Sequence, residues 1–180
     1  MNLVSKVVWL GESLFVDSLA DYKHYLGDIG RTLIVGNPSK EFRANANTVN
    51  QIVDAAGKLS QNRRGALVVV DFGSDLRPED FLYSGISIEA QLSTELLINL
   101  FATDTPLHDG AVLVKGNKII SAGVILPLSR QGISRYGTRH LAALGISERF
   151  DRCICIVVSE ETGTLSLANQ GKLERPITSS

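Results

Sequence analysis

The stretch Gly65-Ala66-Leu67-Val68-Val69-Val70-Asp71 is continuously apolar and rich in β-branched residues up to its closing aspartate. Such a run predicts a strand covered on both faces, since a strand with one wet face alternates apolar and polar side chains. A second run of the same kind, Arg152–Val158, predicts another buried strand. A sheet that contains such strands needs a covering layer on each side.

Two segments have the spacing of amphipathic helices that could supply this cover. Apolar residues from Asn47 onward recur at intervals of three, four and seven positions, at Val49, Ile52, Val53, Ala56 and Leu59. A second helix is predicted over residues 92–101 and is stopped by Asp104-Thr105-Pro106, because the residue before a proline avoids the helical region. Between the first strand and this helix, residues 72–85 predict a long surface loop.

A hairpin follows, in which Ala111–Lys115 and Lys118–Val124 flank the two-residue turn Gly116-Asn117. A short helix from about Thr138 to Leu144 and a last strand at Leu165–Ala168 complete the prediction. Helices that alternate with strands and one hairpin predict an α/β fold, with a central mixed β-sheet flanked by helices on both faces.

The 180 residues carry 18 Lys+Arg against 19 Asp+Glu, so a broadly basic surface for nucleic acid is excluded. No apolar run approaches the ~18 residues that span a bilayer, and the first residues lack the features of a signal peptide. We therefore expect a cytoplasmic protein without a membrane segment. The composition changes near residue 45, which predicts an appendage at 1–44, regulatory or oligomerising, and one domain at 45–180.

Three segments could carry chemistry, and each also has a plain structural interpretation. In Pro106–Ala111, His108 and Asp109 precede two small residues at the start of a strand, which suits a metal ion or a proton transfer but also suits an ordinary turn. In Tyr136–His140, Gly137 and Thr138 precede a helix, which suits an anion or a plain helix cap. Ser159–Gly163 comes after a buried strand, where ligands of open α/β sheets collect, or is a solvated turn.

The common phosphate-binding motifs are missing from the chain. It contains neither Gly-x-x-x-x-Gly-Lys-Ser/Thr nor Gly-x-Gly-x-x-Gly, which disfavours the folds that depend on them. These three segments by themselves predict a site for an anion and a metal ion, and they do not specify a reaction.

The amino-acid sequence from about residue 47 to 174 resembles the diadenylate cyclase domain. That family condenses two ATP into cyclic di-AMP and two pyrophosphates. Five stretches match in order, namely Leu59-Ser60-x-x-Arg63-x-Gly65-Ala66-Leu67-Val68-Val69, Thr105-Pro106-Leu107-His108-Asp109-Gly110-Ala111, Leu126-Pro127-Leu128-Ser129, Gly137-Thr138-Arg139-His140 and Ser159-Glu160-Glu161-Thr162-Gly163. Residues 1–44 lie outside this resemblance.

The resemblance implies that Asp109 is the catalytic carboxylate, which holds a divalent metal and draws the proton from a ribose 3′-hydroxyl. Gly110 and Ala111 would leave room for the sugar and phosphates. The metal would be Mn²⁺ or Mg²⁺, with His108 and one of Glu160 or Glu161 as further partners, and Glu160 is favoured.

The same resemblance implies an ATP site and a partner. The segment Gly137, Thr138, Arg139 and His140 would grip the triphosphate, Ser159 would lie on its far side, and Leu126 would pack on the adenine. Two domains would meet face to face as a homo-oligomer, because each holds one ATP whose 3′-oxygen attacks the α-phosphorus of the other. The implied fold is the same sheet flanked by helices.

One departure from the family pattern keeps a second hypothesis open. The family's usual Arg-His-Arg is here Arg139-His140-Leu141, which removes a charge-assisted contact worth about 1.5–3 kcal/mol. The alternative is therefore a weak or inactive module that binds adenine nucleotides and senses them. A purely structural interaction domain would leave the ordered matches unexplained.

Overall fold

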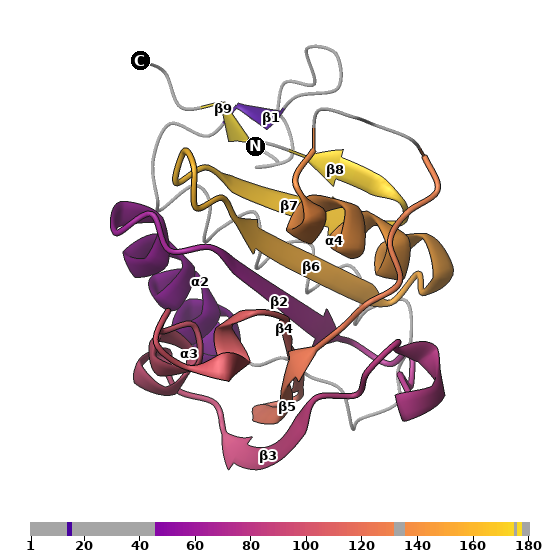
Figure 1. Ribbon diagram of the computed structural model, residues 1–180, viewed down its shortest axis with the longest axis horizontal. Coiled ribbons are helices and arrows are strands. Elements are labelled where there is room, and N and C mark those ends of the chain that lie inside the picture. The colour runs from indigo at the N-terminus through magenta and orange to yellow at the C-terminus, as the bar shows by residue number, and fades with distance from the viewer. Residues whose placement is uncertain (1–13, 16–45, 132–135, 175, 178–180) are drawn as a thin grey trace, which may run out of the picture.

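The computed structural model describes residues 14–15, 46–131, 136–174 and 176–177 (Figure 1). The predicted appendage therefore lies outside the described residues, except for β1 (Leu14–Phe15), which pairs in parallel with β9 (Pro176–Ile177). The predicted boundary near residue 45 stays a prediction. Among the helices that the structure describes, none combines the length and the apolar character that crossing a bilayer requires.

A seven-stranded mixed sheet forms the centre of the domain, in the order β3-β5-β4-β2-β6-β7-β8 (Figure 1). β2 and β4 are parallel, and every other neighbouring pair in this sheet is antiparallel. The strands are β2 (Ala66–Asp71), β3 (Ile86–Gln91), β4 (Ala111–Lys115), β5 (Lys118–Val124), β6 (Cys153–Val158), β7 (Leu165–Asn169) and β8 (Lys172–Glu174).

Helices cover both faces of the sheet, as the buried runs predict. α2 (Ala46–Gln61) and α3 (Thr94–Leu100) pack on one face, and α4 (Thr138–Arg149) packs on the other. Side chains alternate along β2, so that Val68 and Val70 join the core under α2 while Leu67 and Val69 join the core under α4. All six residues of β2 are buried, which confirms the strand predicted from Gly65–Asp71.

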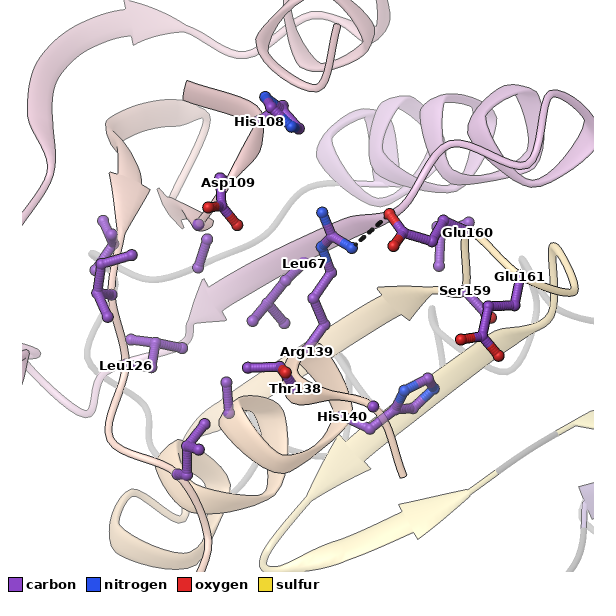
Figure 2. Close-up of a pocket in the computed structure, with 18 of the residues that line it drawn as sticks. Leu67, His108, Asp109, Leu126, Thr138, Arg139, His140, Ser159, Glu160 and Glu161 are labelled. Carbon is purple, nitrogen blue, oxygen red and sulfur yellow. Dashed lines mark hydrogen bonds and ion pairs between the residues drawn. The ribbon is translucent and has the colours of Figure 1, made fainter. Parts of the chain in front are cut away.

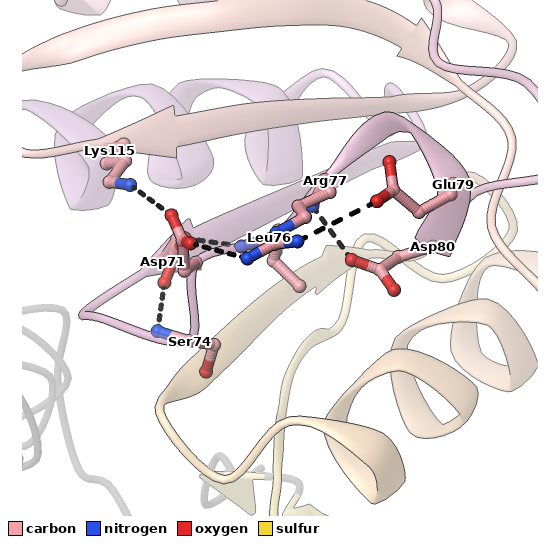
Figure 3. Close-up of polar contacts among 8 residues, drawn as sticks. Asp71, Ser74, Leu76, Arg77, Glu79, Asp80 and Lys115 are labelled. Atoms are coloured by element: carbon pink, nitrogen blue, oxygen red, sulfur yellow. Dashed lines mark hydrogen bonds and ion pairs between the residues drawn. The ribbon is translucent and has the colours of Figure 1, made fainter.

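The two ends of β2 have different surroundings. At its carboxyl end, the buried carboxylate of Asp71 accepts the backbone N–H of Gly73 at 2.9 Å. It also accepts those of Ser74 at 2.6 Å and Leu76 at 3.2 Å (Figure 3). These bonds fix the start of the loop predicted over 72–85, which also contains a 3-10 helix at Pro78–Asp80. At the other end of β2, Leu67 lines a cleft.

The seven-stranded sheet contains two strands that were not among the predicted elements. β3 and β8 lie at the two edges of the sheet. β3 carries mostly exposed or half-buried side chains, and its register shifts between Ser87 and Ala90, with Glu89 at a positive φ of 49°. Its residues from Ile86 to Gln91 alternate apolar and polar side chains, as a half-exposed strand does, and the bulge interrupts the regular pairing of that alternation with β5.

α4 also runs further than predicted, to Arg149 instead of about Leu144. The predicted helix ends before Gly145, because glycine lowers helix propensity. In the structure, a Cβ at Gly145 would lie 2.7 Å from the backbone nitrogen of Ser129. This glycine lets residues 127–129 cross the helix closely, and it does not end the helix.

Candidate functional site

A cleft of about 880 Å³ lies where β2 and β4 begin and β5 and β6 end. Its volume is in the range of small-molecule sites, about 300–1,000 Å³. Every residue to which the resemblance assigns a role in the site lines this cleft, namely His108, Asp109, Gly110, Ala111, Leu126, Gly137, Thr138, Arg139, His140, Ser159, Glu160 and Glu161. Four segments that are separated in the sequence, at residues 108–111, 126, 137–140 and 159–161, therefore meet in one place.

Asp109 is held at the cleft by the turn that leads into β4. It comes directly after a 3-10 helix at Pro106–His108, and its side chain is exposed to the cleft (Figure 2). Behind it, a Cβ at Gly110 would lie 2.6 Å from the carbonyl carbon of Gly123. Gly110 is therefore required by the close approach of β5, in addition to any room that it leaves for a ligand.

His108 is fixed in one tautomer by its own turn. Its Nδ1 donates a hydrogen bond to the carbonyl oxygen of Thr105, and a carbonyl can only accept. The lone pair of the ring is then on Nε2, which is the form of histidine that can ligate a metal. His108 and Asp109 thus offer one imidazole nitrogen and one carboxylate on the same side of the cleft.

The opposite wall is the start of α4. Gly137 is the N-cap, and no side chain caps the helix. The first N–H groups of α4 and the Thr138 hydroxyl border the cleft, where they and the helix dipole favour an anion.

Arg139 extends from this wall and is tied to the loop after β6. Its Nη1 lies 3.0 Å from Oε2 of Glu160, and the two side chains are 23% and 63% exposed. Figure 2 shows this pair across the cleft from Asp109. A partly exposed ion pair of this kind contributes little to the free energy of unfolding, about 0–1 kcal/mol. Its main effect is to hold the Arg139 guanidinium in place at the cleft.

His140 has a different environment from its neighbours in the motif. It is buried, its Nε2 lies 3.4 Å from Oγ of Ser166, and its ring stacks with Tyr136 at 5.9 Å between centroids. The ring lies on the side of Ser159 and Glu161 in Figure 2, away from Asp109. A role in gripping phosphate stays a prediction.

The loop after β6 is a tight turn that returns to the sheet. The backbone N–H of Ser159 bonds to the carbonyl of Thr164, and Ser159 Oγ accepts the N–H of Thr162 at 3.3 Å. Gly163, at a positive φ of 74°, closes the turn against the carbonyl of Ser60. This geometry presents Ser159 and both glutamates at the cleft.

The predicted set of metal ligands is only partly assembled. Within the part of the chain that the structure describes, no three His, Cys, Asp or Glu side chains lie close enough to hold a metal ion together. Glu160 pairs with Arg139 across the cleft from Asp109. The donors of Asp109 and His108 nevertheless fit a divalent ion that takes its other ligands from substrate phosphates and water, as Mg²⁺ usually does.

Sequence reasoning placed Leu126 at the cleft but gave no role to its other large apolar residues. Leu67 of β2 forms part of its wall, and Leu82, Ile125 and Leu128 line one rim with side chains 71%, 39% and 45% exposed. Leu82 falls in a segment with no apolar period, and it reaches the rim because Tyr83 and Ile125 form an antiparallel bridge. No signal in the linear sequence reveals that pairing.

Comparison with known proteins places this cleft in a family. The family model DAC, described as DisA bacterial checkpoint controller nucleotide-binding, matches residues 53–173, which include every residue that lines the cleft. A second model, metallopeptidase family M24, matches residues 5–76, which is less than half of the chain and largely outside the described residues.

Individual relatives agree with the first model. A cyclic di-AMP synthase, CdaA, of Bacillus subtilis is 43% identical over 145 residues, 79% of this chain and 51% of that protein. A diadenylate cyclase of Listeria monocytogenes is 47% identical over 131 residues, 72% of this chain and 47% of that protein. This chain thus spans about half the length of these curated relatives.

A solved structure extends the agreement to three dimensions. The crystal structure of a double mutant of DacA from Staphylococcus aureus has a TM-score of 0.64 and 40% sequence identity, and the match covers 72% of this chain and 85% of that one. With the family model matched over residues 53–173, this confirms the resemblance of the motifs: the chain belongs to the DAC family of nucleotide-binding domains.

Proposed function

We propose that this chain is a diadenylate cyclase, a nucleotidyltransferase that joins two ATP molecules into cyclic di-AMP and releases two pyrophosphates. One observation carries the proposal. In a member of this family, a single cleft holds an exposed carboxylate, Asp109, opposite a helix start with Thr138 and Arg139. A carboxylate that accepts a proton and an anion site that holds phosphates are the two functions that the reaction requires.

In the proposed reaction, the chain positions the two reactants and offsets charge. The 3′-oxygen of one ATP attacks the α-phosphorus of the other, the bond from that phosphorus to the pyrophosphate oxygen breaks, and the hydroxyl proton passes to Asp109. The reciprocal attack, by the 3′-oxygen of the second ATP on the α-phosphorus of the first, closes the ring and releases the second pyrophosphate, and its proton passes to the partner's Asp109. Thr138, Arg139 and the N–H groups at the start of α4 hold the negative triphosphate and leaving pyrophosphate. Most of the rate enhancement in such transfers comes from this alignment and charge stabilisation.

A divalent cation, Mn²⁺ or Mg²⁺, belongs to this proposal. Asp109 and Nε2 of His108 would hold it, and Glu160 would join them only after leaving Arg139. When bound, the ion would neutralise phosphate charge and make the sugar hydroxyl more acidic.

The reaction also requires a second copy of the chain, because one cleft has one Asp109 and two ATP molecules must react. The exposed apolar side chains beside the cleft support a face-to-face arrangement. Leu82, Ile125 and Leu128 line its rim, and Tyr83 and Ile86 are 55% and 53% exposed nearby in the sequence. Clustered exposed apolar residues of this kind are typical of interaction surfaces. We call Leu82, Tyr83, Ile86, Ile125 and Leu128 the apolar rim.

The test is to incubate the chain with ATP and Mn²⁺ or Mg²⁺ and to identify the product by mass spectrometry. We expect cyclic di-AMP and pyrophosphate, and an Asp109→Asn variant should lose about 100-fold or more of the rate while it still binds ATP. Asp104→Asn is the matched control, since Asp104 is exposed and lies outside the cleft lining. Absence of cyclic di-AMP, or full rate in Asp109→Asn, would overturn the proposal.

The second candidate is a nucleotide-binding module that does not turn ATP over, favoured by Leu141. It predicts ATP binding without product in the natural chain, and product formation in Leu141→Arg. Leu141 is half-buried and is not among the residues that line the cleft, although Thr138, Arg139, His140 and Ala142 are. For a cyclase, we therefore expect turnover in the natural chain and a similar rate in Leu141→Arg.

A further inference from the structure

Gly65 lies buried just before β2, in contact with the ion pair of the cleft. An added Cβ at Gly65 would lie 2.8 Å from Cζ of Arg139 and 2.8 Å from Oε2 of Glu160. Packed carbon atoms prefer separations of about 3.5–4.0 Å, so no side chain fits while the pair keeps its place. The guanidinium of Arg139 therefore occupies the volume that a side chain at residue 65 would fill.

The backbone gives no other reason for glycine here. Among the described residues, the glycines with positive φ are Gly73, Gly85, Gly116, Gly123, Gly163 and Gly171. Gly65 is not one of them, so its φ does not require a residue without a side chain. A side chain at residue 65 is excluded by the ion pair of Arg139 and Glu160.

Gly65 also differs from the other tightly packed glycines near the cleft. A Cβ at Gly110 or Gly145 would meet main-chain atoms, of Gly123 and of Ser129. Main-chain atoms in a packed sheet or helix cannot move alone, whereas the end of an arginine side chain can. An alanine at residue 65 would therefore displace the guanidinium and leave the fold intact.

We propose that Gly65 is a positioning residue for Arg139: its missing side chain leaves the space in which the guanidinium lies beside Glu160, facing the cleft. This inference rests on the proposed function, in which Arg139 binds the triphosphate. The guanidinium has several N–H donors and uses Nη1 for Glu160, so the same pair that orients it leaves donors for a phosphate. Holding the group in place before ATP arrives lowers the entropy cost of binding.

Replacing Gly65 with alanine should weaken the binding of the phosphates of ATP and leave the binding of adenosine unchanged. In Gly65→Ala, the guanidinium must leave its place, and the charge-assisted contact to the triphosphate weakens. We expect ATP affinity, measured by calorimetry, to fall on the order of 10-fold, with KM raised by a similar factor and kcat less affected. Adenosine, which has no phosphate, should inhibit the variant and the natural chain equally.

A double-mutant cycle separates this role from general damage. Arg139→Ala removes the guanidinium with which an alanine at residue 65 would clash. Gly65→Ala should therefore cost nothing further in ATP affinity when Arg139 is already alanine. Gly116→Ala is the control for a strained glycine away from the cleft, because Gly116 has φ +60° and open space around it. It should lower the melting temperature and leave ATP affinity unchanged.

A measurement without nucleotide keeps the inference separate from the cyclase proposal. The Nε–Hε signal of Arg139 in a ¹⁵N NMR spectrum should shift in Gly65→Ala, because the guanidinium is displaced, and also in Glu160→Gln, because its partner loses its charge. If the natural chain makes no cyclic di-AMP, the cyclase proposal fails and this signal still tests Gly65.

Three results would overturn the role of Gly65. They are an unshifted Arg139 signal in Gly65→Ala, natural ATP affinity in that variant, and additive losses in the double variant. Should Gly65→Ala fail to fold, the double variant with Arg139→Ala should fold again, and a double variant that is also unfolded would refute the inference.

Discussion

Gly110 packs directly against the main chain of Gly123, so that the strand after Asp109 and the end of β5 approach more closely than any side chain allows. A Cβ at Gly110 would lie 2.8 Å from Cα of Gly123 and 3.0 Å from the backbone nitrogen of Val124. The position of Asp109 in the cleft thus depends on contact between two backbones. This relationship leads to the first prediction.

Gly110→Ala should destabilise the fold and impair the cleft together. Forcing a methyl group into packed main chain costs about 1–3 kcal/mol, because one of the two strands must move. The free energy of unfolding in urea measures the loss, and the rate of cyclic di-AMP formation should fall further than the folded fraction does. A variant with natural stability would show that β4 and β5 are less tightly packed here than the structure indicates.

Removing divalent metal should stop the reaction without weakening the fold. Within the described residues, no cluster of three His, Cys, Asp or Glu exists to make a structural metal site. EDTA should therefore abolish cyclic di-AMP formation, Mn²⁺ or Mg²⁺ should restore it, and the melting temperature without nucleotide should stay the same. A melting temperature that drops in EDTA would point to a structural metal, and activity that persists would exclude a metal-dependent mechanism.

Leu82→Asp should separate self-association from folding. Leu82 is 71% exposed, so its replacement should change the free energy of unfolding by no more than about 0.5 kcal/mol. A charge in the apolar rim should instead weaken the proposed dimer, which analytical ultracentrifugation measures, and activity should fall most at low protein concentration. Asn117→Asp, in the exposed hairpin turn, introduces the same charge as a control. Dimers that persist in Leu82→Asp would exclude the apolar rim as the contact.

Cys153 should make the fold sensitive to alkaline pH. A hydrogen bond with Cys155 and burial raise the pKa of the Cys153 thiol well above its usual value. The unfolded chain loses this proton near pH 8.5 while the folded chain keeps it, so the stabilisation is complete below that pH. Above it, the free energy of unfolding should fall by up to about 1.4 kcal/mol per pH unit.

This pH effect is checked by comparing how steeply the free energy of unfolding falls with pH in the natural chain and in a variant without the Cys153 thiol. Urea unfolding from pH 7.5 to 10 should show a steeper decline for the natural chain than for Cys153→Ala, whatever stability that variant loses at neutral pH. Parallel curves would contradict the raised pKa.

Local patterns were sufficient to predict the elements that bury side chains. The hairpin of Ala111–Lys115 and Lys118–Val124 agrees with β4 and β5 residue for residue, and Gly116 has the expected positive φ. The helix begun near Asn47 is α2. The prediction omitted β3, although its residues Ile86, Ile88 and Ala90 alternate with polar ones as in a strand with one exposed face. β8 escaped prediction because its three residues are too few to show a period.

The sequence by itself determined the buried strands, the helices that cover them and, through its motifs, the family and the residues at the cleft. Only the tertiary structure revealed that Arg139 lies on Gly65 and pairs with Glu160, that Gly110 meets Gly123, and that Leu82 borders the cleft. The physical reason is the separation along the chain of the residues that interact. Periodicity and turn chemistry act between neighbours along the chain, whereas these contacts join residues that only the folded sheet brings together.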